Sequence, residues 1–262
     1  YYTTFLELLK MEKLKLAKKY AGRTFCAQDV LGVLLERRAL GEMCARAYRD
    51  DETVGVGTDP MVDFNKIKAR LDKHPNVFAG DYKNFDRSIP AAAMYAIRDC
   101  LMTANPKISN EIKSTMNTLI ERLQVTGKTL SAVLGGLPSG CFSTAVLNSL
   151  INEFLIYACF KSACDDAFVP SDWHSYRNNV ERIFYGDDVV VSVSNDYAQY
   201  FNRRIVSKKM MELFGMILDS SSKDGVESDF DTYEDLSWIS RFFRKLGKYP
   251  IVTGALKKIS IE

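Results

Sequence analysis

The chain has 262 residues, enough for one large domain or two small ones. Hydrophobic residues make up 47% of it and charged residues 26%, a composition that excludes disordered and fibrous proteins. The formal net charge is only +2, so a nucleic-acid-binding surface would need its positive charge gathered in one channel. Six Cys residues without C-x-x-C spacing indicate reduced thiols in a cytosolic protein, and no apolar run is long enough to span a membrane.

The first half of the chain is predicted to be mainly helical, with loops and a short buried strand before Asp81. In chain order, we expect a mainly helical region over 1–50 with a short strand near 23–27, a loop over 50–63, a strand over 77–80, and a helix from Ser88 to about Ala104. Because the chain starts at Tyr1 without a methionine and ends abruptly at Glu262, we expect it to be part of a longer polypeptide.

In the second half, clustered glycines mark a loop and apolar runs mark hairpins. The predicted elements are a loop over 135–140, a helix over 143–160, a hairpin over 181–193, a helix over 196–214, and a second hairpin formed by 236–246 and 249–253. The order strand, helix, helix, hairpin, helix, hairpin predicts an α+β fold in which helices pack on one face of a sheet.

Two adjacent acids, Asp187 and Asp188, follow Gly186 between two apolar runs. Gly186 can adopt the positive φ of a tight hairpin turn. Neighbouring side chains on extended backbone point to opposite faces, so we expect one Asp to bind a metal directly while the other supports it. Taken alone, the segment fits an ordinary hairpin turn equally well.

A second acidic segment contains Asp81, at the end of the predicted strand over 77–80, and Asp86, in the turn before the next helix. Carboxylate oxygens are the ligands that Mg²⁺ prefers, and two such ions can stabilise the attacking and leaving oxygens of an in-line displacement. Asp81 and Asp187 on neighbouring strands would supply this arrangement. Alone, the segment fits a strand end and a solvated turn.

The glycine-rich loop over 135–141 leads into Thr144, Asn148 and Asn152, which are spaced four apart and share one helix face. Short side chains that both donate and accept hydrogen bonds suit the hydroxyls of a ribose, and the 2′-hydroxyl distinguishes RNA from DNA. An ordinary surface helix would carry Lys, Glu or Gln there, so the sequence favours a binding face.

Together these segments resemble motifs A, B and C of picornavirus-like RNA-dependent RNA polymerases, in the order of that family. The matching segments are 81–86 for motif A, Ser139-Gly140 with Thr144 and Asn148 for motif B, 185–188 for motif C, Lys223 for motif D, 238–245 for motif E, and 22–25 for the end of motif F, with Lys10, Lys13, Lys18 and Lys19 as its basic part. The resemblance covers nearly the whole chain.

The resemblance implies a right-hand polymerase fold, with an antiparallel palm sheet, packed helices, part of the fingers, and a thumb that is largely missing. The implied segments are 1–75 for fingers with motif F, 76–104 for palm motif A, 105–130 for a fingers insertion, 131–235 for palm motifs B, C and D, and 236–262 for motif E and the start of the thumb.

The resemblance also implies template-directed RNA synthesis in the replication of a positive-strand RNA virus genome. An RNA 3′-hydroxyl would attack the α-phosphate of an NTP and release pyrophosphate, with two Mg²⁺ ions, replaceable by Mn²⁺, held by Asp81 and Asp187 and supported by Asp188. The other implied site residues are Asp86, Ser139, Gly140, Thr144 and Asn148 for the ribose, Arg23, Lys10 and Lys13 for the triphosphate, Lys223 as the acid that protonates pyrophosphate, and Arg241, Phe242, Phe243 and Lys245 for the primer.

The implied partners are an RNA template and primer, NTPs and other viral replication proteins, in membrane-associated replication complexes of the host cytoplasm.

Three alternatives remain open from the residues. A reverse transcriptase also carries paired Asp residues on a hairpin, and a non-catalytic RNA-binding fragment would keep the same motifs. A cysteine protease using Cys141 would need His74 or His174 as its base, and Cys159, Cys164 and His174 lack the spacing of a zinc finger.

Overall fold

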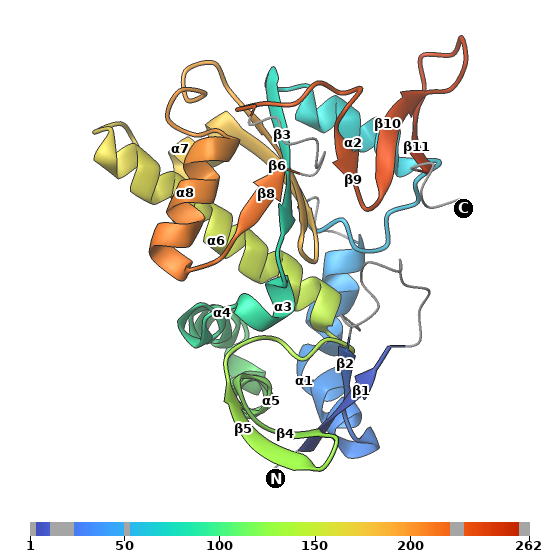
Figure 1. The fold of residues 1–262 in the computed structure, drawn as a ribbon, viewed down its shortest axis with the longest axis vertical. Helices are drawn as coiled ribbons and strands as arrows, with labels where there is room; N and C mark the ends of the chain where they lie inside the picture. The colour runs from blue at the N-terminus through green and yellow to red at the C-terminus, as the bar shows by residue number, and fades with distance from the viewer. Residues whose placement is uncertain (1–3, 11–23, 50–52, 221–227, 257–262) are drawn as a thin grey trace. The chain divides into compact units, whose positions relative to one another are not determined.

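The computed structural model describes residues 4–10, 24–49, 53–220 and 228–256 (Figure 1). The chain divides into two compact units, one formed by 1–46 with 84–148 and the other by 47–83 with 149–262. The chain therefore passes from one unit to the other three times, and the third crossing falls within a helix, after Asn148. None of the described helices combines the length and the hydropathy that crossing a membrane requires.

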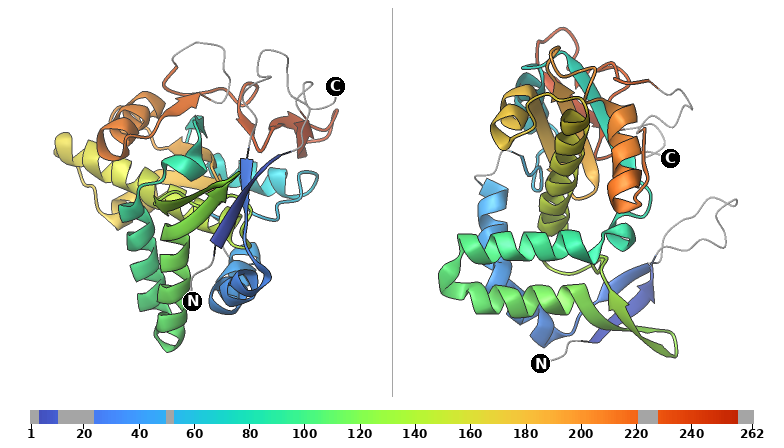
Figure 2. Two further views of the ribbon diagram at one scale, coloured as in Figure 1. Left: turned by 60° about the horizontal axis from the view of Figure 1, so that its bottom comes forward. Right: turned by 90° about the vertical axis from the view of Figure 1, so that its left-hand side faces the viewer.

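The first unit contains a mixed four-stranded sheet and a pair of helices. Its elements are β1 (Thr4–Leu9), β2 (Thr24–Ala27), α1 (Val30–Arg49), α3 (Phe85–Ser88), α4 (Ala91–Ala104), the 3-10 helix η2 (Pro106–Ile108), α5 (Ser109–Ile120), β4 (Glu121–Thr126), β5 (Thr129–Leu134) and the start of α6 (Thr144–Asp166). The strand order is β2-β1-β4-β5, with β1 antiparallel to β2 but parallel to β4. Figure 2 shows α4 and α5 lying side by side.

The prediction of helix over 1–50 is wrong for Thr4–Leu9 and right for Val30–Arg49, and the strand predicted near 23–27 is present as β2. In β1, Phe5 is completely buried while its neighbours Thr4 and Leu6 are exposed, which is the alternation of a strand. Its hydrogen-bonding partners include β4, more than one hundred residues away, so local periodicity could not reveal this strand.

A carboxylate on β1 joins three strands of this sheet. Glu7 accepts hydrogen bonds from the hydroxyls of Thr24 on β2 and Thr126 on β4 and from the Gln124 amide, and it forms an ion pair with Arg87. The hydrogen bond from Thr126, with that from Thr24, lowers the pKa of Glu7, so the carboxylate stays ionised. Arg87 directly follows Asp86, and the ion pair therefore ties α3 to the sheet.

The second unit contains two antiparallel sheets and several helices. Its elements are α2 (Asp63–Leu71), β3 (Asn76–Tyr82), the rest of α6, α7 (Trp173–Asn179), β6 (Val180–Tyr185), β7 (Asp188–Val193), α8 (Arg203–Phe214), β8 (Leu218–Ser220), β9 (Ser237–Trp238), β10 (Arg241–Lys245) and β11 (Val252–Leu256). The larger sheet has the order β6-β7-β3-β8 and the smaller one the order β11-β10-β9.

Both faces of the larger sheet are covered, which corrects the prediction of helices on one face only. Alternate residues of β3 point to opposite faces. Val77 and Ala79 belong to a core cluster with Phe64 of α2 and Trp238 of β9. Phe78 packs instead on Phe201 and Phe230, and Phe201 also contacts Phe160 of α6. Figure 1 shows α6 and α8 beside one face and α2 with β9–β11 beside the other.

Several predicted boundaries shift. The helix predicted from Ser88 begins at Ala91 instead, because the Ser88 hydroxyl donates to the Phe85 carbonyl and belongs to α3. The helix predicted over 143–160 continues to Asp166, and the one predicted over 196–214 begins only at Arg203, where the Asn202 side chain caps it by accepting from Ile205 N. Both predicted hairpins are present, the second as part of the three-stranded sheet.

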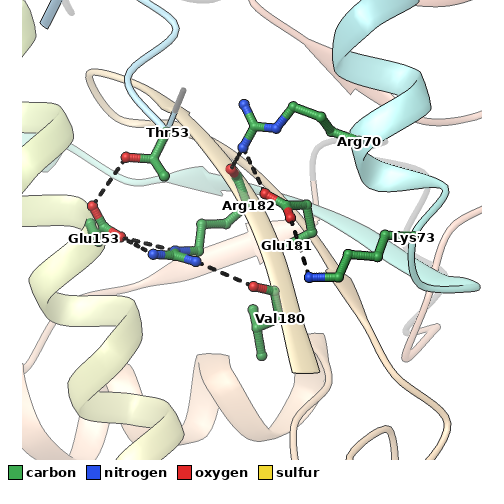
Figure 3. Close-up of polar contacts among 7 residues, drawn as sticks. All are labelled: Thr53, Arg70, Lys73, Glu153, Val180, Glu181 and Arg182. Atoms are coloured by element: carbon green, nitrogen blue, oxygen red, sulfur yellow. Dashed lines mark hydrogen bonds and ion pairs between the residues drawn. The ribbon is translucent and has the colours of Figure 1, made fainter. Parts of the chain in front are cut away.

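A buried ion pair fixes β6 to α6 (Figure 3). Arg182 Nε and Nη2 lie 2.9 and 2.6 Å from Glu153 Oε1, and both side chains are mostly buried. The Arg182 guanidinium also lies over the rings of Tyr176 and Trp173. On the preceding residue of β6, Glu181 pairs with Arg70 of α2 at 2.6 Å. Oppositely charged partners thus reach β6 from two different helices.

We predict that Glu153→Ala lowers the free energy of unfolding by about 3 kcal/mol, because the buried Arg182 guanidinium is left uncompensated. The matched control is Glu42→Ala, which breaks an exposed pair with Arg46 and should cost less than about 1 kcal/mol. Urea denaturation followed by circular dichroism measures both variants. Equal losses would contradict a structural role for the buried pair.

Candidate active site

The β6–β7 hairpin carries the adjacent acids on a two-residue turn. Tyr185 pairs with Asp188, which leaves Gly186 and Asp187 as the two turn residues. Gly186 has a φ of +62°, and a Gly with positive φ at the first turn position is typical of a tight hairpin. Asp187 is exposed and Asp188 partly exposed, so the two acids differ in their exposure to solvent. Their different roles as metal ligands stay a prediction.

Strand β3 brings Asp81 to the same end of the sheet. Gly80 lies opposite Val189 in the antiparallel pairing of β3 with β7. Asp81 and Asp188 are the next residues along this register, so both follow the paired residues toward the β6–β7 turn. The prediction that Asp81 ends a strand beside the hairpin is therefore confirmed, although β3 continues one residue further, to Tyr82.

An additional acid lies directly opposite Asp81 on the other neighbouring strand. Asp219 of β8 pairs with Asp81 and is exposed. Directly opposed residues of an antiparallel pair share one face of the sheet, and like charges placed there repel each other unless a cation lies between them. Sequence reasoning missed Asp219, because β8 has only three residues and no apolar run marks it.

The donor set at this end of the sheet fits Mg²⁺. Asp81, Asp187, Asp188 and Asp219 offer only carboxylate oxygens, which are hard ligands, and all four are at least partly exposed. Within the described residues, no group of three or more His, Cys, Asp or Glu could hold an ion alone. Mg²⁺ is usually bound by one or two carboxylates together with substrate phosphates, so an open set of this kind suits it.

The backbone of the turn is held by polar side chains from α6. Gly186 N donates to Ser149 Oγ at 2.9 Å, and Asn152 Nδ2 lies 3.1 Å from the carbonyl oxygens of both Gly186 and Asp187. The Tyr82 hydroxyl donates to Asn152 Oδ1 at 2.9 Å. Burial raises the pKa of Tyr82 well above its ordinary value, so the hydroxyl keeps its proton.

Asn152 was predicted to share a ribose-binding helix face with Asn148, because the two are spaced four residues apart. In the structure the Asn152 amide instead donates hydrogen bonds to the backbone of the Gly186–Asp187 turn. Sequence reasoning also missed Ser149 and Tyr82. For Ser149 and Asn152, the available signal was that small polar residues stand among the apolar residues of this helix, since buried polar groups need partners.

In the first unit, two of the predicted ribose-binding residues are joined by a hydrogen bond. Asn148 Nδ2 donates to Asp86 Oδ1 at 2.6 Å. Asn148 is only 4% exposed, and its Oδ1 is buried without a hydrogen-bond partner among the described residues. The pair therefore offers a buried acceptor next to a carboxylate. Asp86 lies in the short helix α3 and not in an irregular turn.

The loop before α6 is fixed at both ends by buried charged residues. Arg122 Nη1 donates to the carbonyls of Gly135 and Gly136 at 3.0 and 2.7 Å. At the other end, the fully buried Glu36 of α1 accepts from Ser143 N at 2.8 Å, which satisfies a free N–H at the start of α6. Between them, Leu137 N donates to the Asp86 carbonyl at 2.7 Å.

The other predicted ribose contacts lie in or beside this loop. The Thr144 hydroxyl lies 2.9 Å from the Cys141 carbonyl and 3.2 Å from the Pro138 carbonyl, so its proton is used within the loop. Ser139 is partly exposed, and its carbonyl accepts from Cys26 N of β2. Gly140 has a φ of +109°, and a Cβ there would approach the Cys26 carbonyl oxygen to 2.9 Å.

The predicted primer contacts lie on β10. Arg241 Nη1 donates to the Gly254 carbonyl at 2.9 Å, Phe242 is partly exposed beside Arg244, and Lys245 is exposed. Phe243 is buried against Phe64 of α2, so it packs in the core. Of the predicted basic residues, Lys10 is exposed after β1, whereas Lys13, Lys18, Lys19, Arg23 and Lys223 lie outside the described residues.

The cysteines do not support the protease or zinc interpretations. Cys141 is buried, and burial raises the pKa of its thiol well above the ordinary value, which opposes a nucleophilic thiolate. Burial also raises the pKa values of Cys159 and Cys164 to about 12, while His174 is exposed and contacts Asn178. The described residues contain no group that could hold a zinc ion.

Comparison with known proteins identifies the family. The family model described as viral RNA-dependent RNA polymerase matches residues 1–262. The chain belongs to this family. It is 46% identical over 266 residues to the polyprotein FSD of Solenopsis invicta virus 3, and 28% identical over 248 residues to the replication polyprotein of Nora virus. The first match covers 100% of this chain and 8% of the Solenopsis invicta virus 3 polyprotein. The second covers 90% of this chain and 12% of the Nora virus polyprotein.

A solved structure supports the same fold. The sicinivirus 3Dpol RNA-dependent RNA polymerase superposes with a TM-score of 0.83 at 21% identity, covering 99% of this chain and 54% of that one. The α+β architecture with antiparallel sheets is therefore that of a right-hand polymerase, as predicted. The assignment of individual segments to palm, fingers and thumb stays a prediction.

We predict that Gly136→Ala destabilises the chain by about 3 kcal/mol, since the added Cβ would lie 2.9 Å from the Asp86 carbonyl oxygen at a φ of +61°. Gly127→Ala is a matched control with a φ of +60° and no atom within 4 Å, and it should cost only about 1 kcal/mol for the backbone conformation. Thermal denaturation measures both. Similar losses would show that the loop does not pack tightly on α3.

Proposed function

We propose that this chain catalyses template-directed RNA synthesis, in which an RNA 3′-hydroxyl attacks the α-phosphate of an NTP and releases pyrophosphate. The observation that carries the proposal is the convergence of Asp81, Asp187 and Asp188 at one end of the β6-β7-β3-β8 sheet, in a chain of the viral RNA-dependent RNA polymerase family. Phosphoryl transfer depends chiefly on positioning and charge stabilisation, which this set can provide.

Asp81 and Asp187 would hold the divalent ions, with Asp188 in support. When bound, Mg²⁺ supplies stabilisation of the charge on the attacking and leaving oxygens, and Mn²⁺ can take its place. The chain's own part is to present carboxylates from two segments on rigid strands. The Gly186 turn exposes Asp187, and the pairing of β3 with β7 fixes where Asp81 lies relative to it.

Asp86 and Asn148 would select a ribonucleotide. A ribose 2′-hydroxyl can donate to the buried Asn148 Oδ1, which has no other partner among the described residues, and the Asp86 carboxylate holds the amide in that orientation. Ser139, Gly140 and Thr144 belong to the adjoining loop, and their contact with the ribose remains part of the proposal.

The remaining roles rest on the family resemblance. Arg23, Lys10 and Lys13 would bind the triphosphate, Lys223 would protonate the leaving pyrophosphate, and Arg241, Phe242 and Lys245 would contact the primer. We also propose an RNA template, an RNA primer, NTPs and other viral replication proteins as partners, in membrane-associated complexes of the host cytoplasm. The name of one relative, the replication polyprotein of Nora virus, supports a role in viral replication.

Replacing a metal-binding carboxylate gives the most direct test of the reaction. We predict that Asp187→Asn lowers the rate of RNA primer extension with Mg²⁺ by about a hundredfold or more, because a charged ligand is lost at the reacting phosphate. Asp196→Asn removes an exposed carboxylate beyond β7 and should leave the rate unchanged. Equal rates for Asp187→Asn and the unsubstituted chain would reject the proposal.

Sugar selection tests the Asp86–Asn148 pair. We predict that Asn148→Ala lowers kcat/KM for a ribonucleotide about tenfold or more and changes that for the deoxyribonucleotide by less than about twofold, because a hydrogen bond beside a charged group is lost. Asn117→Ala, which removes an amide that contacts Arg98, is the control and should not change the ratio. A chain that prefers deoxyribonucleotides from the start would favour a reverse transcriptase.

A further inference from the structure

The turn that carries Asp187 is bound to α6 through its main chain and not through its acids. Ser149 accepts from the Gly186 N–H, and the Asn152 amide lies within 3.1 Å of two successive carbonyls of the turn. Two side chains of one helix therefore bond three backbone groups of this turn, the Gly186 N–H and the carbonyls of Gly186 and Asp187. A tight turn would otherwise bind water at these groups.

The two contacts with Gly186 are buried, and the one with the Asp187 carbonyl is partly buried. Ser149 and Asn152 are completely buried, and Gly186 is buried although Asp187 beside it is exposed. Hydrogen bonds made by buried groups have no water to replace them, so the position of the turn follows the position of the helix. Asp187 is thus exposed, while hydrogen bonds from α6 hold the backbone that carries it.

Tyr82 extends the same network to the strand that carries Asp81. Its hydroxyl donates to Asn152 Oδ1 at 2.9 Å, which orients the amide so that Nδ2 faces the two carbonyls. Tyr82 directly follows Asp81 on β3, and neighbouring strand residues point to opposite faces. Asp81 therefore points away from α6 while its neighbour is bonded to it.

We propose that Asn152, together with Tyr82 and Ser149, is a positioning residue that sets the spacing between the Asp81 and Asp187 carboxylates. One amide is bonded at one end to the residue after Asp81 and at the other to the backbone of Asp187. Displacement of a reacting group by about 1 Å can cost a hundredfold in rate, so such a link matters beyond stability. This inference rests on the proposed function.

The test compares Asn152→Ala with Asn202→Ala in the full chain. Asn202 is also a buried asparagine with two backbone hydrogen bonds, to Ala198 O and from Ile205 N, but it caps α8. Electron paramagnetic resonance of free Mn²⁺ measures metal affinity, and primer extension measures kcat and KM for the NTP. Tyr82→Phe, which keeps the ring and removes only the hydroxyl, is a milder variant.

We expect Asn152→Ala to weaken Mn²⁺ affinity and to lower kcat, each by about tenfold, with KM changed by less than about twofold. Tyr82→Phe should give a smaller change in the same direction, and Asn202→Ala should lower the melting temperature without either change. The inference is overturned if Asn152→Ala matches the unsubstituted chain in both measurements, or if Asn202→Ala weakens them equally.

The two proposals fail in different ways. If Asp187→Asn leaves primer extension unchanged, the polymerase proposal is rejected whatever Asn152 does. If Asp187→Asn abolishes Mn²⁺ binding and extension while Asn152→Ala changes neither, only the positioning role is rejected. An unsubstituted chain that extends no primer rejects the polymerase proposal, and the Mn²⁺ affinities of the variants then decide the positioning role alone. An unsubstituted chain that also binds no Mn²⁺ overturns both.

Discussion

The antiparallel pairing of β3 with β7 determines where the acids of the second unit lie. Its register places Gly80 opposite Val189, so Asp81 and Asp188 follow at the same end of the sheet. A slip of one residue would turn Val77 and Ala79 out of the core cluster they share with Phe64 and Trp238. The packing of both faces therefore enforces the register, and the register in turn brings the carboxylates together.

Much of this arrangement is predictable from sequence because it depends on short-range signals. The continuous apolar run before Asp81 and the two runs around Gly186 mark buried strands, and Gly with a following Asp marks the turn. The helix α6 was predictable for the same reason, because its apolar residues recur at helical spacing along the chain. These elements fold as their local sequence prefers, so a hairpin beside a strand that ends at Asp81 was predictable from the sequence.

The elements that were missed depend on partners distant in sequence. Strand β1 hydrogen-bonds to β4, and β8 is only three residues long beside β3. Asn152 illustrates the same limit for a side chain. Its spacing from Asn148 predicted a shared role, but the Gly186–Asp187 turn, more than thirty residues later, uses its amide. Helical spacing indicates which residues share a face and gives no information on what packs against that face.

Buried charges mark the places where segments that carry site residues are fixed. Arg122 and Glu36 hold the two ends of the loop before α6, and the ion pair between Arg182 and Glu153 holds β6. Arg182 pairs with Glu153, Arg122 donates to backbone carbonyls, and Glu36 accepts from Ser143 through Oε1. Such partners matter, because an uncompensated buried charge would destabilise the fold strongly.

Ser149 and Asn152, the α6 side chains that hydrogen-bond to the turn backbone, are neutral, and electrostatics gives a reason for this. A Lys or Arg at position 152 would pair with Asp187 and oppose the binding of a cation, while an additional carboxylate would repel the turn carbonyls. Ser149, Asn152 and Tyr82 supply hydrogen bonds without adding charge, and burial keeps the Tyr82 hydroxyl protonated. In this proposal the acids at the end of the sheet supply the negative charge that attracts a divalent ion, while electrically neutral residues set their spacing.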